Sequence, residues 1–386
     1  MIIEIQGIGF PNQGAELMLA AVARRLEARF GDRVAPVCRP NLKSRDSAIK
    51  MARYGVAPLL EVSRQNIPLG GCLNLVPSKM TRAFNLYRRK DVDLVLDTSG
   101  LLFSDDWGLD VMRRGAARLQ AQLKRGVPLV FMPQAFGPFK TAESRKVVRP
   151  LFRKAEAVFC RDRRSLEHAR SVDPGENLYL CPDLTIAHHP RAPGLQSIFA
   201  GQVVFIPNKR MLDRTDPEVG KRYLAFFQSL MQGVRDAGED IVLMNHEGDK
   251  DLELCRELQE GLGLDTIHGW PDAEKNKVAL GGAKAVVSSR FHGVVSALSQ
   301  EVPAFCTSWN HKYEELARSF AFPESVLSLE VQPDLQRILS VLQDPIVYDA
   351  ARDKLRESRE RLETEIESMW DRVYHIMEGK LGLSAS

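Results

Sequence analysis

The sequence predicts an α/β protein of two lobes, each built on a parallel sheet, and three observations lead to this prediction. The chain has 386 residues, more than a single hydrophobic core usually supports. Short apolar runs alternate with helical patterns along most of its length. Residues 187–197, A-H-H-P-R-A-P-G-L-Q-S, interrupt this alternation with prolines and a glycine, which is typical of a domain boundary. We therefore expect lobes at residues 1–190 and 198–345.

Short apolar runs predict the strands of the two sheets. They lie at residues 2–5, 92–96, 128–132, 157–160, 203–206, 241–244, 285–288 and 303–306. Continuous apolar strands separated by helices favour parallel sheets covered on both faces. Residues 346–386 show helical spacing without a further strand. They predict a C-terminal helix that crosses back to the first lobe.

Composition and charge narrow the classes of protein. Hydrophobic residues make up 44% and charged residues 27% of the chain, with a formal net charge of +3, so an ordinary globular protein is expected and nucleic acid is not favoured as a partner. The six cysteines are dispersed without a C-x-x-C pair, which indicates buried thiols in a reducing compartment and no metal site. The sequence shows neither a signal peptide nor an apolar run of about 20 residues. We expect a cytoplasmic protein without a transmembrane segment.

In parallel α/β sheets, ligands bind beyond the carboxyl ends of the strands. In the first lobe, the loop G-I-G-F-P-N-Q-G-A-E lacks the dinucleotide spacing, but its Asn12 could cap the following helix and its Glu16 could either complement the helix dipole or act as an acid or base. Asp97 and Ser99 follow the second strand and suit either hydroxyl recognition or a self-capped turn. Gln134, after the third strand, could bind hydroxyls or satisfy backbone groups.

The strongest local signal lies in the second lobe, where a strand ends in S-R-F-H-G at residues 289–293 and an apolar helix follows. Arg290, His292 and the free N–H groups around Gly293 would then surround one point, which predicts an anion site. The alternative is a buried, structural His292. Lys209 and Arg210 follow the neighbouring strand and could add positive charge.

Other polar residues also follow predicted strands. His246 and Lys312 are expected at the same sheet edge as Arg290; each alone suits a surface or packing role, but together they favour a site. Arg161 beside Asp162 could bind an anion, although an ion pair with helix capping is the favoured interpretation.

Several of these motifs resemble the polysaccharide pyruvyl transferase family. They are N-Q-G-A-E (12–16), G-V-P-L-V-F-M-P-Q-A-F-G-P (126–138), R-D (161–162), P-D (182–183) and S-S-R-F-H-G (288–293). The resemblance runs in order from residue 2 to about residue 320. Two elements depart from the family pattern: Ala15 replaces an acidic residue, and T-S-G at 98–100 replaces G-G-G. Both departures fall in the first lobe.

The resemblance implies two Rossmann-like lobes in a GT-B-like arrangement with a cleft between them. It implies transfer of a pyruvyl group from phosphoenolpyruvate to a sugar or lipid-linked glycan, with no other cofactor and with peripheral membrane association as an open possibility. The residues implied for phosphoenolpyruvate are Arg290, His292, Gly293, Lys209, Arg210 and Lys312. Those assigned to the acceptor are Asn12, Ser99, Gln134 and His246, and those to catalysis are His292, Glu16 and Asp97.

Two other functions fit the same residues. A GT-B glycosyltransferase using a nucleotide sugar would also need an anion site in the second lobe, and Glu314 or Glu315 would then have to bind the ribose. A catalytically inactive binding protein of the family would explain the altered first-lobe motifs. The acceptor sugar, the ketal positions and the oligomeric state are left open.

Overall fold

Parallel sheets form the centre of both halves of the chain, as the sequence predicts. The computed structural model describes residues 1–10, 12–41, 46–60, 63–64, 67–68, 76–213, 215–307 and 312–382. The chain divides into two units. Unit 1 comprises Met1–Phe10, Ala15–Leu184 and Glu365–Ser386, and unit 2 comprises Pro11–Gly14 and Thr185–Thr364.

The sheet of unit 1 has the strand order β10-β9-β8-β7-β1-β2-β3-β6, and every pairing in it is parallel. Its strands are β1 (Ile2–Gln6), β2 (Ala35–Cys38), β3 (Ala57–Leu60), β6 (Tyr87–Arg88), β7 (Leu94–Asp97), β8 (Leu129–Gln134), β9 (Ala157–Cys160) and β10 (Leu178–Leu180). The order reverses between β1 and β7, and this switch point is where loops diverge to leave room for a ligand. The loops after these two strands carry Gly7 and Ser99.

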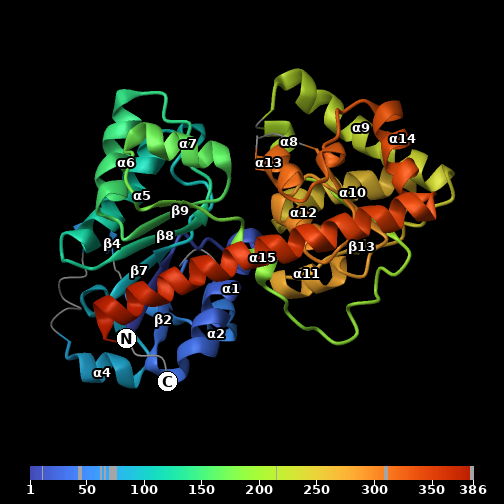
Figure 1. The fold of residues 1–386 in the computed structure, drawn as a ribbon. Helices are drawn as coiled ribbons and strands as arrows, with labels where there is room; N and C mark the ends of the chain where they lie inside the picture. Colours follow the sequence, from blue (N-terminus) through green and yellow to red (C-terminus); the bar gives the residue numbers. More distant parts are fainter. Residues whose placement is uncertain are drawn as a thin grey trace. The chain divides into compact units, whose positions relative to one another are not determined.

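Helices flank the sheet of unit 1, and in Figure 1 α5, α6 and α7 lie together beside β8 and β9. The helices of unit 1 are α1 (Gln13–Phe30), α2 (Ser47–Arg53), α4 (Ser78–Ala83), α5 (Leu109–Leu123), α6 (Ala142–Lys154) and α7 (Arg163–Val172). Phenylalanines fill much of the space between helices and sheet: Phe131 packs edge-on against Phe103, Phe136 and Phe152, all fully buried. Such apolar burial is the main stabilising term of the unit.

Unit 2 repeats the plan on a smaller scale, with the parallel strand order β13-β12-β11-β14-β15. Its strands are β11 (Val203–Ile206), β12 (Ile241–Met244), β13 (Ile267–His268), β14 (Ala285–Ser288) and β15 (Ala304–Cys306). Its helices are α8 (Arg210–Asp213), α9 (Pro217–Asp236), α10 (Gly248–Leu262), α11 (Ala273–Leu280), α12 (Phe291–Leu298), α13 (Lys312–Ser319) and α14 (Val331–Leu342). The central strands β11 and β14 are buried throughout, which explains their unbroken apolar sequences.

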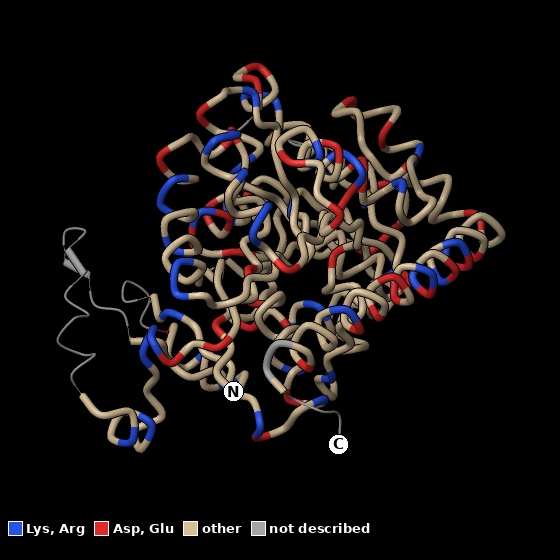
Figure 2. Tube along the Cα trace, turned by 60° about the vertical axis from the view of Figure 1, so that its left-hand side comes forward, with Lys and Arg blue, Asp and Glu red and all other residues tan. Residues whose placement is uncertain are grey.

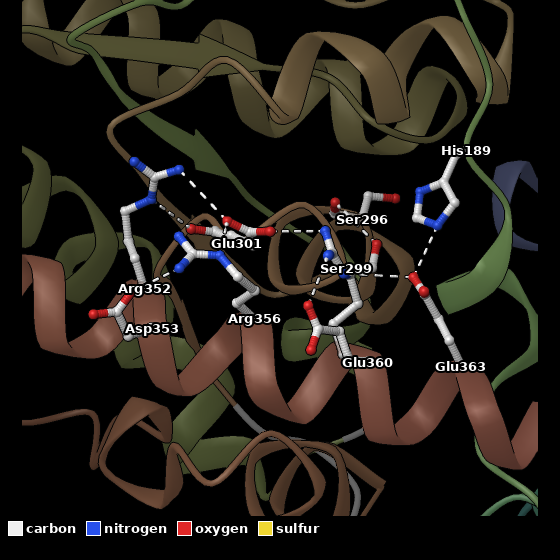
Figure 3. A network of polar contacts seen from close by, with 10 residues as sticks. His189, Ser296, Ser299, Glu301, Arg352, Asp353, Arg356, Glu360 and Glu363 are labelled. Carbon is white, nitrogen blue, oxygen red and sulfur yellow. Dashed lines mark hydrogen bonds and ion pairs between the residues drawn. The ribbon is translucent and has the colours of Figure 1, made fainter.

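The C-terminal helix α15 (Pro345–Leu381) contributes to both units, since the boundary between them falls after Thr364. In unit 2, Glu301 accepts from arginines on one face of this helix (Figure 3): its carboxylate is 2.7 Å from Arg359 and 3.3 Å from Arg356. The backbone of Glu301 is in the left-handed region, with φ of 61°, a conformation that is uncommon for residues other than glycine.

In unit 1, α15 packs through aromatic residues against α1. Tyr374 lies edge-on to Phe30 at 5.5 Å, and the guanidinium groups of Arg25 and Arg29 lie over the rings of Trp370 and Tyr374. These contacts combine apolar burial with cation–π attraction. The final part of the helix is therefore a structural component of unit 1.

The described cysteines are all free thiols. Cys38, Cys160, Cys181, Cys255 and Cys306 are free and buried, and burial raises the pKa of each thiol. The sixth cysteine of the sequence, Cys72, lies outside the described residues. Among the helices that the structure describes, none is long and apolar enough to cross a membrane.

Candidate functional site

The polar cluster of unit 2 lies beyond the carboxyl ends of β11, β12 and β14. Asn208 follows β11, His246 follows β12, and Ser289 follows β14; all three are buried. The side-chain amide of Asn208 donates to the carbonyl oxygen of Ser289 at 2.7 Å, which ties the two strand ends together. This side-chain bond adds to the backbone bond from the N–H of Ser289 to the carbonyl oxygen of Ile206.

Arg290 occupies the N-cap position of α12, and its guanidinium already has two carboxylate partners. Nε donates to Asp251 at 2.6 Å, and Nη1 pairs with Glu247 at 2.9 Å. The sequence predicts a guanidinium placed for an anion, and it gives no sign of these two carboxylates. Burial opposes the charge on Arg290, but Glu247 and Asp251 outweigh this effect and raise its pKa. The result is a rigid cation with fixed orientation.

His246 is buried beside Arg290 and is held in its neutral form. Burial lowers its pKa to about 3, and the positive charges of Arg290 and His292 act in the same direction. Within the described residues, neither Nδ1 of His246 nor Oδ1 of the preceding Asn245 has a hydrogen-bond partner. Two unsatisfied buried atoms at one strand end are unusual and favour a ligand there. His246, which was expected at the acceptor, lies beside Arg290, which was expected to bind the donor.

Glu247 was not singled out from the sequence, although it directly follows His246. Burial raises the pKa of its carboxyl group, while the cations Arg290, His292 and Arg210 oppose that rise. A carboxyl group whose pKa is shifted toward neutrality beside an arginine is a candidate proton donor. The available signal was its place directly after a predicted strand.

The remaining cations expected around this point have different neighbours. The backbone N–H of Lys209 donates to Asp251 at 3.0 Å, so Asp251 joins Lys209 to Arg290. Arg210 forms an exposed ion pair with Asp213. Lys312 lies over the ring of Phe291, 5.1 Å from its centroid. Lys209 and Arg210 thus lie at the border of the cluster. Lys312 contacts Phe291, which is the first residue of α12.

His292 is the second residue of α12, and the short segment from the N-terminal loop lies against it. A Cβ atom on Gly14 would be 2.6 Å from Cε1 of His292 and nearer still to Nδ1. The segment is held by Gln13, which donates to the carbonyl oxygen of Trp270 at 2.8 Å and accepts from Asn276. Asn12, expected at the acceptor, is exposed in the same segment. Gly293 is also closely packed, since a Cβ there would lie 2.7 Å from Oγ of Ser288.

A second polar cluster lies in unit 1 beyond β7 and β8. Asp97 is fully buried and accepts from Oγ of Ser99 at 2.5 Å and from Nε2 of Gln134 at 3.0 Å. Burial raises the pKa of Asp97 to about 6, and both hydrogen bonds oppose the rise. Within the described residues, Oε1 of Gln134 is buried without a partner. The three residues expected here are therefore brought together, and one acceptor atom remains available.

Glu16 has a different environment from the one expected of a catalytic base. It is fully buried, bonded to Lys50 and to the hydroxyl of Tyr54 at 2.9 Å, with Arg53 at 3.9 Å. Its oxygens are occupied by residues of α2 and the following turn, which local sequence could not place. A structural role in joining α1 to α2 accounts for this carboxylate.

Asp162 caps a helix, as the sequence favoured, but Arg161 forms its ion pair with a different residue from the one expected. Asp162 caps α7 by accepting from the backbone N–H of Ser165 at 2.7 Å. Arg161 pairs with buried Asp183 at 3.1 Å instead of with its neighbour.

The fold is that of an α/β protein built on two parallel sheets. The chain is similar to HepE of Anabaena in complex with UDP and glucose, with a TM-score of 0.59, 14% identity and coverage of 97% of this chain and 99% of that chain. It is also similar to a putative UDP-N-acetylglucosamine 2-epimerase from Listeria monocytogenes, with a TM-score of 0.57, 12% identity and coverage of 100% and 97%. A third similar structure is MnaA of S. aureus with UDP, with a TM-score of 0.57, 13% identity and coverage of 96% of this chain and 97% of that chain. These similarities confirm the GT-B-like fold class.

Residues 12–311 match the polysaccharide pyruvyl transferase family. Because this match covers most of the chain, the protein belongs to that family of transferases, and the resemblance noted from the motifs is confirmed. No curated protein matches the sequence at a significant level.

Proposed function

We propose that the protein transfers the pyruvyl group of phosphoenolpyruvate to two hydroxyls of a sugar in a polysaccharide or its precursor, forming a ketal and releasing phosphate. The observation that carries the proposal is the cluster of Arg290 with neutral His246 at the strand ends of unit 2, in a chain of the pyruvyl transferase family. The donor needs cations and N–H donors for its phosphate and carboxylate. Arg290, Lys209 and the N-terminus of α12 supply these groups.

The electron and proton balance of the reaction defines the groups required. One sugar hydroxyl adds to C2 of phosphoenolpyruvate while C3 takes a proton, the bond from C2 to the phosphate oxygen breaks, and the second hydroxyl closes the ketal. Of the two hydroxyl protons, one is balanced by the new methyl group and the other by the released phosphate. The reaction therefore needs an acid for C3, a base for the hydroxyls and stabilisation of the leaving phosphate.

We assign these tasks from protonation state and surroundings. Glu247 is the proposed acid for C3, because its carboxyl group lies beside Arg290 and burial raises its pKa. His292 is proposed to donate to the leaving phosphate, and Arg290 to balance its charge. Asp97, with a pKa of about 6, is ionised at neutral pH yet basic enough to accept a proton, and we assign it to the acceptor together with Gln134.

The test is phosphate release from phosphoenolpyruvate with a panel of glycan acceptors, together with thermal unfolding in the presence of candidate donors. We expect phosphoenolpyruvate to raise the melting temperature, because it binds the native state, and UDP-sugars to leave it unchanged. A shift with UDP or UDP-glucose and none with phosphoenolpyruvate would instead identify a nucleotide-sugar glycosyltransferase. Binding of phosphoenolpyruvate without phosphate release on any acceptor would support the inactive binding protein.

A further inference from the structure

The short helix α4 of unit 1 exposes large apolar side chains to solvent. Phe84 is 76% exposed and Met80 is 58% exposed. They are four residues apart, so they lie on the same side of the helix. Of the α4 residues, only Thr81 is buried. The helix therefore contributes little to the core while it displays an aromatic ring and a thioether.

Phe84 directly follows α4, at a helix end whose last carbonyl groups are hydrogen-bonded. The backbone N–H of Leu86 donates to the carbonyl oxygen of Thr81 at 2.9 Å, and that of Asn85 to Arg82 at 2.9 Å. Asn85 has a left-handed φ of 53°. These features form a Schellman motif, which satisfies the last carbonyl groups of a helix. The ring of Phe84 is thus presented by an ordered turn.

A buried arginine holds the start of α4 in place. Arg88 is 2% exposed, and its guanidinium donates to the carbonyl oxygen of Val76, to Oγ of Ser78 and, at 2.8 Å, to Asp91. Burying a guanidinium is costly unless its hydrogen bonds are satisfied. Here those bonds fix a helix that itself has little apolar contact with the core. The position of α4 is therefore specified by the fold.

The segment that contains α4 is rich in basic residues. Residues 78–90, S-K-M-T-R-A-F-N-L-Y-R-R-K, contain no acidic residue. Lys79, Arg82 and Lys90 are exposed, while the nearest carboxylate in sequence, Asp91, pairs with Arg88. In Figure 2, α4 at the lower left carries blue segments and no red ones. The exposed apolar pair thus sits in a positive local field.

We propose that α4 is a docking surface for an anionic lipid bilayer. Phe84 and Met80 insert into the boundary between headgroups and acyl chains, and Lys79 and Arg82 contact the anionic headgroups. A bilayer is favoured over a protein partner because a stable protein interface needs about 800 Å² per partner, whereas separate apolar side chains can enter a membrane one by one. The same chemistry keeps the enzyme at a surface where lipid-linked substrates would be found. The inference does not depend on the pyruvyl donor.

The test is sedimentation of the full chain with vesicles of phosphatidylcholine alone or mixed with phosphatidylglycerol. We expect binding only to the anionic vesicles and weakening as salt is raised. Lys79→Gln with Arg82→Gln should weaken binding about 25-fold, since each base near an anionic surface contributes roughly fivefold. Met80→Ser with Phe84→Ser should weaken it at least about tenfold.

Matched controls use exposed residues elsewhere. Ile346→Ser removes a side chain that is 81% exposed, and Lys140→Gln removes an exposed charge; both should bind as the parent does. Equal binding to neutral vesicles, absence of binding to anionic ones, or full binding by the α4 variants would overturn the proposal. So would a change of oligomeric state by light scattering on Phe84→Ser without a change in vesicle binding, since α4 would then be a contact between copies of the chain.

Discussion

Gly14 lies against the imidazole of His292, within unit 2, so closely that no side chain fits between them. Gln13 holds the segment in place through Trp270 and Asn276. The ring of His292 is thus positioned by residues that are far away in the sequence. The consequence is that the N-Q-G motif helps to shape the polar cluster of unit 2, even though most of the helix that it begins belongs to unit 1.

Gly14→Ala should therefore displace the imidazole. We expect turnover with phosphoenolpyruvate to fall about tenfold to a hundredfold, because a shift of about 1 Å in a catalytic group has that effect, while donor binding changes less. Gly9→Ala is the matched control, since a Cβ there meets nothing within 4 Å. Steady-state kinetics and donor titration separate the two effects. Unchanged turnover in Gly14→Ala would show that the position of His292 does not limit the reaction.

Arg290→Lys should weaken binding of phosphoenolpyruvate by about 2 kcal/mol or more, roughly thirtyfold. Lysine keeps the charge but loses the planar fork that contacts Asp251 and Glu247 and that we propose binds the donor. Arg290→Ala should also lower the free energy of unfolding by about 3–5 kcal/mol, because two carboxylates lose their partner. Arg161→Lys, in the buried pair with Asp183, is the control for stability and should leave the dissociation constant within about twofold. The same result for Arg290→Lys would place the donor elsewhere.

Asp97→Asn should stabilise the protein at neutral pH and slow the reaction. The pKa of Asp97 rises from 3.8 to about 6 on folding, so ionisation costs the folded state up to about 3 kcal/mol above pH 6, and the cost disappears below pH 3.8. Urea unfolding at pH 8 and pH 4 should show the gain only at pH 8. Asp91→Asn should have the opposite effect, because Arg88 lowers the pKa of Asp91. If Asp97→Asn were no more stable than the parent at pH 8, the raised pKa of Asp97 would be contradicted.

His246→Gln should make the protein less sensitive to acid. The pKa of His246 falls from 6.5 to about 3 on folding. Above pH 6.5 the imidazole is neutral in both states and does not affect stability. As the pH falls from 6.5 toward 3, the unfolded state binds a proton that the folded state does not, and the free energy of unfolding decreases. Between pH 6.5 and 5 the parent should lose about 2 kcal/mol relative to the variant. The exposed His375→Gln is the control. Parallel unfolding curves for parent and His246→Gln across this range would exclude a buried neutral imidazole.

The central strands could be predicted because their apolar runs are continuous. The runs at 157–160, 203–206, 241–244 and 285–288 match β9, β11, β12 and β14 residue for residue. The strands that were missed are short and near the sheet edges, or contain proline, such as β2 with A-P-V-C and β3 with A-P-L-L. Their pairing depends on neighbouring strands, which local pattern does not encode.

Only the site residues that directly follow a strand could be predicted from the sequence. Arg290 and His246 follow apolar runs, so their shared edge was accessible from sequence. The partners of Arg290 were not, because Glu247 and Asp251 look like ordinary acidic residues at a helix start. The surroundings of Glu16 were hidden for a related reason: Lys50, which pairs with it, comes from a helix whose packing the sequence does not reveal.

The division of α15 between the units has a consequence for biosynthesis. Ile366, Met369, Val373 and Met377 are buried in the part of the helix that belongs to unit 1. Unit 1 is thus begun first on the ribosome but is completed only after residues 185–364 have been made, a delay of roughly 10–40 s at ordinary elongation rates. Until then the apolar surface of α1 that packs against this helix is exposed to solvent. Nascent chains stalled in unit 2 should therefore be clients of chaperones that bind exposed apolar surface.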